Sequence, residues 1–183
     1  MPKPYTVSVG YARIPPPWLF QSDPERLLLS VGGATRAESV RNGLEDLPNE
    51  CTTVLVHDAA RPLVTDAMIA RVVDVARSGV PAIAALPVVD TLKEVDADGR
   101  IVRTVPRAGL WRAQTPQGFP RALLERAHRE GLRRGDHAAA TDDAALCEAL
   151  GVEVRVVTGS ERALKVTEAG DFARAEHLAS LEE

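Results

Sequence analysis

The sequence predicts one α/β domain built around a mostly parallel sheet, and three observations lead to that prediction. Its 183 residues, 45% of them hydrophobic, are enough to bury one core without disulfides or a structural metal. Short apolar runs typical of buried strands alternate with segments of helical periodicity. Polar clusters follow the ends of several of these predicted strands, as they do in α/β domains that bind ligands there.

Charge, hydropathy and cysteine use narrow the class of protein. The formal net charge of −4 is too acidic for a general nucleic-acid binder. The longest apolar run, over 81–89, is too short to span a bilayer, and the N-terminus lacks the continuous apolar segment of a signal peptide. Cys51 and Cys147 lie far apart and form no C-x-x-C pair. We therefore expect a cytoplasmic protein with no membrane or nucleic-acid partner.

Residues 1–26 are expected to form an irregular arm, followed by the domain at 27–183. Six of the 13 prolines lie in the first 24 residues, and three successive prolines at 15–17 exclude a helix there. Within this arm, Tyr5 to Val9 alternates apolar and polar side chains as a strand does.

The first half of the domain alternates strands with helices. Residues 27–31 form an apolar run that two glycines end, and residues 36–47 repeat apolar side chains at helical spacing. Residues 52–56 are mostly β-branched and apolar, as in a buried strand. Amphipathic helical spacing returns over 65–77, and an apolar strand follows over 81–89. Buried strands separated by helices favour a parallel sheet.

A hairpin interrupts this alternation. Residues 92–95 and 101–105 flank a turn that contains glycine, and both are polar on each side. We therefore expect a β-hairpin arm, at about 91–107, that projects from the domain.

The alternation resumes after the arm. A strand is predicted over 110–114 and an amphipathic helix over 121–134. The remaining elements are a helix over 139–150, an apolar strand over 152–157 and a closing helix over 171–181.

Four polar clusters follow predicted strands, at the edge where open α/β sheets bind ligands. They begin at Gly32, His57, Asp90 and Thr115. Each alone is explained by a turn or a helix cap, but four at one edge indicate a binding site. Lys165 stands in an apolar stretch near the end of a strand, where a cation suits a phosphate. The clusters and this lysine together predict an anionic, phosphorylated small molecule as the ligand.

Several common catalytic motifs are missing from the sequence. It contains no G-x-x-x-x-G-K-[ST], G-x-G-x-x-G, H-E-x-x-H or G-x-S-x-G. These absences argue against an ATPase, a dinucleotide dehydrogenase, a zinc protease and a serine hydrolase. The four histidines show no ligand spacing, and three of them stand in polar, helical or loop surroundings. We therefore expect no metal site built from protein ligands.

Six motifs, in order, carry a resemblance to a known family. They are GGATRAESV at 32–40, VHDAARP at 56–62, DTLK at 90–93, LWRAQTPQGF at 110–119, TDDA at 141–144 and ALKVT at 163–167. From about residue 27 to residue 181, the chain resembles the 2-C-methyl-D-erythritol 4-phosphate cytidylyltransferases of non-mevalonate isoprenoid synthesis. The resemblance implies a Rossmann-like nucleotidyltransferase domain. It also implies an enzyme that joins CTP to methylerythritol phosphate with Mg²⁺ and releases pyrophosphate.

The resemblance also assigns roles to nine residues. Lys165 and Asp58 would be catalytic. The residues that bind the acceptor or the reacting phosphate would be Arg61, Thr91, Arg107, Thr115 and Thr141, and the cytidine pocket would include Gly33 and Ser39. In this family the hairpin arm embraces a second subunit, so the resemblance implies a homodimer in which Thr91 and Arg107 complete the partner's site.

The glycine-rich triphosphate loop of the family has no counterpart before Gly32. That stretch holds one glycine, Gly10, and one lysine, Lys3, whereas the family's loop combines several glycines with an arginine and a catalytic lysine. We therefore expect an N-terminally incomplete form of the enzyme, with weak or no turnover by these 183 residues alone. Two alternatives stay open: a ribitol 5-phosphate cytidylyltransferase, and a non-catalytic homologue that acts as a dimer partner.

Overall fold

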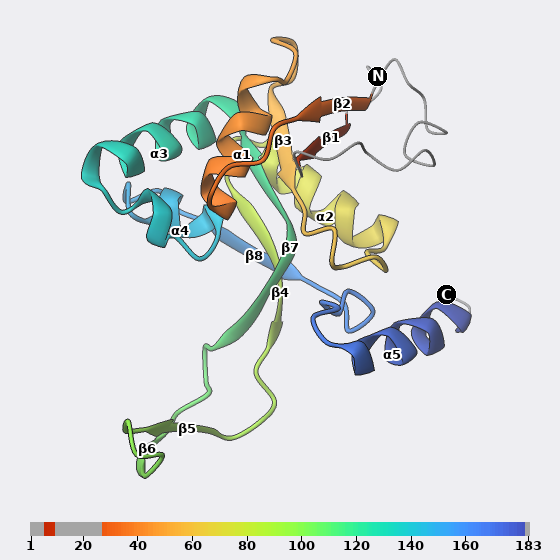
Figure 1. The fold of residues 1–183 in the computed structure, drawn as a ribbon, viewed down its shortest axis with the longest axis vertical. Helices are drawn as coiled ribbons and strands as arrows, with labels where there is room; N and C mark the ends of the chain where they lie inside the picture. The colour runs from red at the N-terminus through yellow and green to blue at the C-terminus, as the bar shows by residue number, and fades with distance from the viewer. Residues whose placement is uncertain (1–5, 10–26, 182–183) are drawn as a thin grey trace.

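The computed structural model describes residues 6–9 and 27–181, in which a central sheet carries helices on both faces (Figure 1). The sheet has four strands in the order β3-β7-β4-β8. These strands are β3 (Thr53–Val56), β4 (Ala82–Pro87), β7 (Trp111–Pro120) and β8 (Arg155–Thr158). The helices are α1 (Arg36–Glu45), α2 (Asp66–Arg77), α3 (Arg121–Arg134), the 3-10 helix η2 (His137–Ala139), α4 (Asp143–Glu148) and α5 (Ala169–Ser180).

Each face of the sheet has its own apolar core. On one face, helices α1, α3 and α4 surround Leu44 and Phe119. On the other face, α2 contributes Met68 and Val72, which pack against β4. Helix α2 approaches β7 closely at Gly118, where an added Cβ would lie only 2.6 Å from Cγ1 of Val72. The lack of a side chain at this glycine therefore sets the distance between helix and sheet.

Strands β3, β4 and β8 run in one direction, and β7 runs in the other. Strand β7 is antiparallel to both β3 and β4, whereas β4 and β8 are parallel. The prediction of an α/β domain with a mostly parallel sheet is confirmed, but the strand predicted over 110–114 is longer and reversed. It follows the hairpin arm, so the returning chain lies beside β4 as its antiparallel neighbour and needs no crossover connection.

The arm consists of β5 (Leu92–Val95) and β6 (Ile101–Val105), which form a two-stranded antiparallel sheet of their own. It projects away from the rest of the molecule, as predicted (Figure 1). The carboxylate of Asp96 closes the turn by accepting the backbone N–H groups of Asp98 and Arg100, at 3.0 and 2.9 Å.

A second pair of strands precedes α1. Strand β1 (Thr6–Val9) pairs in parallel with β2 (Leu27–Ser30), with Thr6 opposite Leu27. The strand predicted at Tyr5–Val9 is therefore present over Thr6–Val9. The rest of the predicted 1–26 arm lies outside the described residues.

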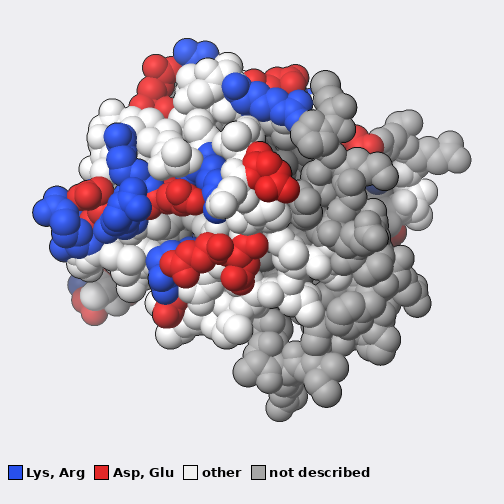
Figure 2. Space-filling model, turned by 90° about the horizontal axis from the view of Figure 1, so that it is seen from above, with Lys and Arg blue, Asp and Glu red and all other residues white. Residues whose placement is uncertain are grey.

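Three further observations concern the helices and the surface. The helix predicted over 139–150 is divided, because the side chain of Asp142 accepts the N–H of Ala145 at 2.9 Å and starts α4 there. Across the described ranges, no helix is long and apolar enough to cross a membrane. On the part of the face opposite the arm that is not covered by undescribed residues, acidic and basic side chains are interspersed (Figure 2).

Candidate active site

The loop after β3 is fixed by a side chain from β7. The backbone N–H of Asp58 donates to Oγ1 of Thr115 at 3.0 Å, and the same oxygen lies 3.0 Å from Nδ1 of His57. Nε2 of His57 lies 3.1 Å from the carbonyl oxygen of Arg61, which can only accept. One neutral tautomer, with the hydrogen on Nε2 and the Thr115 hydroxyl donating to Nδ1, therefore satisfies all three bonds.

The reversed direction of β7 makes this contact possible. Val56, the last residue of β3, pairs with Gln117, so the middle of β7 lies beside the carboxyl end of β3. Thr115 was expected to follow the end of its strand. It lies inside the strand instead, and it still reaches the predicted edge.

The carboxylate of Asp58 faces three cationic side chains. Its Oδ2 lies 3.0 Å from Nζ of Lys165 and 3.8 Å from Nε of Arg61, and its Oδ1 lies 3.7 Å from Nε of Arg36. The side chain of Asp58 is 19% exposed and that of Lys165 is 46% exposed, so this group lies at the rim of the domain. Three positive charges around one carboxylate leave an excess of positive charge, which suits a phosphate group. We call these four residues the Asp58 cluster.

Backbone hydrogen bonds attach the segment after β8 to the loop after β3. The N–H of Val166 donates to the carbonyl oxygen of Ala60 at 2.8 Å, and Nη1 of Arg61 donates to that of Ala163 at 2.7 Å. Burial lowers the pKa of Arg61, while the charge of Asp58 opposes that shift. The structure thus brings together four of the predicted site residues, from three strands or the loops that follow them.

A cavity of about 260 Å³ opens next to this cluster. Four basic and two acidic side chains line it, together with an amide and two apolar side chains. They are Arg61, Arg112, Lys165, Arg174, Glu161, Asp171, Gln114, Ala113 and Leu164. The excess of basic side chains makes the cavity suitable for an anionic small molecule.

Gly33 and Ser39, the predicted nucleotide-binding pair, are bonded to each other. The N–H of Gly33 donates to Oγ of Ser39 at 2.9 Å, and the Ser39 hydroxyl donates to the backbone carbonyl one turn earlier at 3.0 Å. A Cβ at position 33 would lie 2.3 Å from Cγ of Glu38, so glycine lets the turn close onto α1. Within the described residues, this turn reaches Asp58 through Arg36, the first residue of α1.

The other three predicted site residues lie elsewhere. Thr91 and Arg107 stand at the base of the arm, where the Arg107 guanidinium donates to the carbonyl oxygen of Val89. Thr141 is exposed and precedes the cap of α4. No recorded contact joins these three residues to the Asp58 cluster in the part of the chain that the structure describes, so their roles stay predictions.

Sequence reasoning missed the residues behind the cluster. Nη1 of Arg36 lies 2.7 Å from Oδ2 of Asp143, whose Oδ1 lies 3.1 Å from Nε2 of His128. Nδ1 of His128 lies 2.9 Å from Nε2 of His137. These two histidines, on α3 and η2, are buried, which the sequence pattern did not indicate. Gly135, with φ of 81°, ends α3 and turns the chain back, so the two rings meet edge to face.

The charge states of this buried group follow from its surroundings. Burial alone raises the pKa of Asp143, but the hydrogen bond from His128 and the charge of Arg36 outweigh it and lower that pKa. Burial and the neighbouring His128 lower the pKa of His137. Asp143 is therefore a carboxylate and His137 a neutral imidazole at neutral pH.

The described residues do not form a metal cage. Over 6–9 and 27–181, no group of three or more His, Cys, Asp or Glu side chains is placed to hold a metal ion. Asp58 is already opposed by three cations. The Mg²⁺ implied by the resemblance therefore does not fit a site built from these residues alone.

Comparison with known proteins supports one family. The family model described as 2-C-methyl-D-erythritol 4-phosphate cytidylyltransferase matches residues 19–180. A curated protein of that name from Nostoc sp. is 49% identical over 148 residues, which are 81% of this chain and 64% of the relative. Another from Frankia casuarinae is 48% identical over 149 residues, which are 81% of this chain and 54% of the relative. The chain thus spans less than two thirds of the length of these relatives.

Solved structures agree with the sequences. The crystal structure of 2-C-methyl-D-erythritol 4-phosphate cytidylyltransferase from Thermus thermophilus matches with a TM-score of 0.77 at 42% identity, over 85% of this chain and 74% of that one. A crystal structure of 4-diphosphocytidyl-2C-methyl-D-erythritol synthase matches with a TM-score of 0.81 at 37% identity. The match covers 96% of this chain and 82% of that one. On the matched model, sequences and fold, the chain belongs to the 2-C-methyl-D-erythritol 4-phosphate cytidylyltransferase family.

Proposed function

We propose that this protein is a cytoplasmic cytidylyltransferase that joins CTP to 2-C-methyl-D-erythritol 4-phosphate in non-mevalonate isoprenoid synthesis. The observation that carries the proposal is the Asp58 cluster beside the basic cavity, in a chain of this family. A cluster with excess positive charge at the carboxyl end of β3 suits the meeting of two phosphorylated substrates.

The reaction needs no strong general base from the protein. An anionic oxygen of the acceptor's phosphate attacks the α-phosphorus of CTP, a P–O bond forms, and the bond to the pyrophosphate leaving group breaks. No proton has to be removed from the attacking phosphate, so catalysis depends on alignment and on stabilising negative charge. We assign charge stabilisation to Lys165 and Arg61, and the orientation of Lys165 to Asp58 through their 3.0 Å ion pair.

The remaining contacts divide between two sides of the site. Gly33 and Ser39, in the turn before α1, are assigned to the cytidine, and Thr115 and Thr141 to the acceptor side. Mg²⁺ remains a prediction from the family, and we expect it to enter with the phosphates of CTP, as Mg²⁺ commonly does in phosphoryl-transfer sites.

The arm supports a homodimer. Val95, Ile101 and Val102 on its strands are exposed apolar side chains, which a second subunit would cover. Thr91 and Arg107 lie at its base, so in a two-fold dimer they would reach the acceptor pocket of the partner.

The test is pyrophosphate release by the purified chain with CTP, Mg²⁺ and either acceptor, with acceptor binding measured separately by calorimetry. Because residues 1–26 carry no glycine-rich loop, we expect slow release, with binding of methylerythritol phosphate preferred over ribitol 5-phosphate. Lys165→Gln should abolish that binding. Arg155→Gln, which removes an exposed cation paired with Glu153, should not change it.

Two results would contradict the proposal. Preferred binding and transfer with ribitol 5-phosphate would assign a different acceptor. A folded chain that binds neither acceptor, yet co-purifies with an intact cytidylyltransferase, would identify a non-catalytic partner.

A further inference from the structure

A hydrogen-bonded chain leads from the Asp58 cluster into the core. It passes from Arg36 on α1 to Asp143 on α4, then to His128 on α3 and His137 on η2. The three inner residues are almost inaccessible to solvent, with exposures of 0% for Asp143, 1% for His128 and 5% for His137. A buried carboxylate is costly unless it is paired, and Arg36 and His128 are the partners of this one.

The hydrogens in this series of hydrogen bonds can be placed in only one order when both imidazoles are neutral. Asp143 is ionised and only accepts, so Nε2 of His128 carries a hydrogen and donates to it. Nδ1 of His128 then accepts, which requires Nε2 of His137 to donate. Every donor in this part of the chain therefore points toward Asp143.

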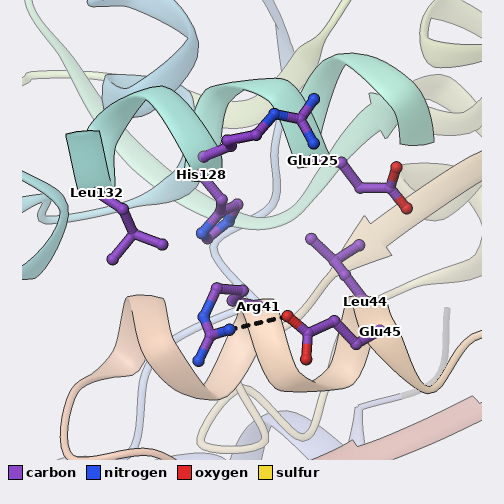
Figure 3. Close-up of a pocket in the computed structure, with 7 residues that line it drawn as sticks. Arg41, Leu44, Glu45, Glu125, His128 and Leu132 are labelled. Atoms are coloured by element: carbon purple, nitrogen blue, oxygen red, sulfur yellow. Dashed lines mark hydrogen bonds and ion pairs between the residues drawn. The ribbon is translucent and has the colours of Figure 1, made fainter. Parts of the chain in front are cut away.

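Among the carboxylates near His128, Asp143 is the one hydrogen-bonded to it, because the two beside the neighbouring cavity pair with arginines. A cavity of about 280 Å³ separates α1 from α3, and His128 points from α3 toward it (Figure 3). Across that cavity, Arg41 pairs with Glu45 at 2.8 Å. On the wall of His128, Glu125 is held by Arg121 at 2.6 Å. Both carboxylates are thus paired with arginines, Arg129 adds a further cation to the lining, and His128 is hydrogen-bonded to Asp143 behind it.

Arg36 is shared between two carboxylates, and the sharing is unequal. It lies 2.7 Å from Asp143 and 3.7 Å from Asp58. Its hold on the buried Asp143 keeps it from closing fully onto Asp58, whose Oδ2 stays with Lys165 at 3.0 Å. If Asp143 lost its charge, Arg36 would move onto Asp58 and compete with Lys165.

We propose that Asp143, held by the His128–His137 pair, is a positioning residue that keeps Arg36 off Asp58 and so keeps Lys165 directed at the acceptor's phosphate. This inference rests on the proposed function for its substrate. The contacts that lead from His128 through Asp143, Arg36 and Asp58 to Lys165, which we call the relay, do not depend on the proposed function.

The first test measures binding of methylerythritol phosphate by calorimetry to the full chain and its variants. Asp143→Asn should weaken binding by about tenfold, the scale found for residues that orient the ligands of metal sites. Gln reproduces the Nε2 donor of His128, so His128→Gln should keep most of the affinity while His128→Phe loses it. Glu130→Gln is the matched control and should bind as the wild type does, because Glu130 is a partly exposed carboxylate on the same helix as His128 and pairs with Arg133.

These variants separate positioning from a purely structural role. A structural role predicts lower melting temperatures with unchanged affinity in the folded protein, and that result for Asp143→Asn and His128→Phe would overturn the proposal. If Asp143→Asn does not fold, the comparison of His128→Gln with His128→Phe decides alone.

A second readout needs no substrate. The chain has three lysines, Lys3, Lys93 and Lys165, so ¹³C-methylation gives few signals and Lys165→Arg assigns one of them. Asp143→Asn should shift the Lys165 signal and leave that of Lys93 unchanged. If the wild type binds no acceptor, the proposed function fails while a shifted Lys165 signal still supports the relay. An unmoved Lys165 signal would refute the relay whatever binds.

Discussion

Replacing Thr115 by Val should release the loop after β3 without disturbing the sheet. The two side chains have nearly the same shape, but Val has no hydroxyl to accept the N–H of Asp58 or to donate to His57. Thr115 is only 5% exposed, so water cannot easily take the place of the lost hydroxyl.

The magnitude follows from the two broken bonds. Leaving a buried donor unpaired costs about 1–3 kcal/mol, which is the upper range for the partly buried Asp58 N–H. His57 is exposed, so water replaces the bond to its Nδ1 at little cost. For a domain of this size, 1 kcal/mol corresponds to about 2–4 °C, so the melting temperature should fall by about 2–12 °C.

The assay is thermal and urea unfolding of the wild type, Thr115→Val and Thr115→Ser. Ser keeps the hydroxyl and loses one methyl group, so its cost should be about 0.8 kcal/mol. Val should be the less stable variant and should also bind the acceptor more weakly, because the loop carries Asp58 and Arg61. A Val variant as stable as the wild type beside a destabilised Ser variant would show that methyl packing, and not the hydroxyl, holds this loop.

Three further predictions concern packing, pH and thiol chemistry. Gly118→Val should lower the free energy of unfolding in urea by about 1–3 kcal/mol, because its Cβ would overlap Val72. The pKa of His137 in the folded state is lowered from 6.5, so the unfolded chain binds more protons than the folded chain as the pH falls below 6.5. Melting temperatures should therefore fall as the pH drops from 6.5, and the fall should be less steep in His137→Gln. Burial raises the pKa of Cys147 to about 12, so iodoacetamide should leave it unmodified in the native state, and mass spectrometry should find the partly exposed Cys51 modified first.

The sequence could predict that the candidate site residues share one edge of the sheet, because parallel strands end on the same side. Asp58 and Arg61 follow β3, and Lys165 follows β8, which runs in the same direction in the sheet. The rule therefore brings these residues to one edge without knowledge of the strand order. Thr115 reaches the same edge for a different reason, since its strand is reversed and the residue lies within it. Apolar periodicity carries no information on strand direction, so this reversal could not be predicted.

The network behind the site could not be predicted because its contacts obey no local spacing. Arg36 and Asp143 are 107 residues apart, and Asp143 lies 15 residues from His128. In the sequence, Asp142 and Asp143 are two acidic residues at the start of a helix, and either suits a cap. The structure makes the first the cap and buries the second, because neighbouring positions on a helix point about 100° apart. In a helix of six residues, periodicity cannot say which of the two faces the core. That one-residue difference decides which aspartate meets Arg36, and therefore which one can act on Lys165 through Asp58.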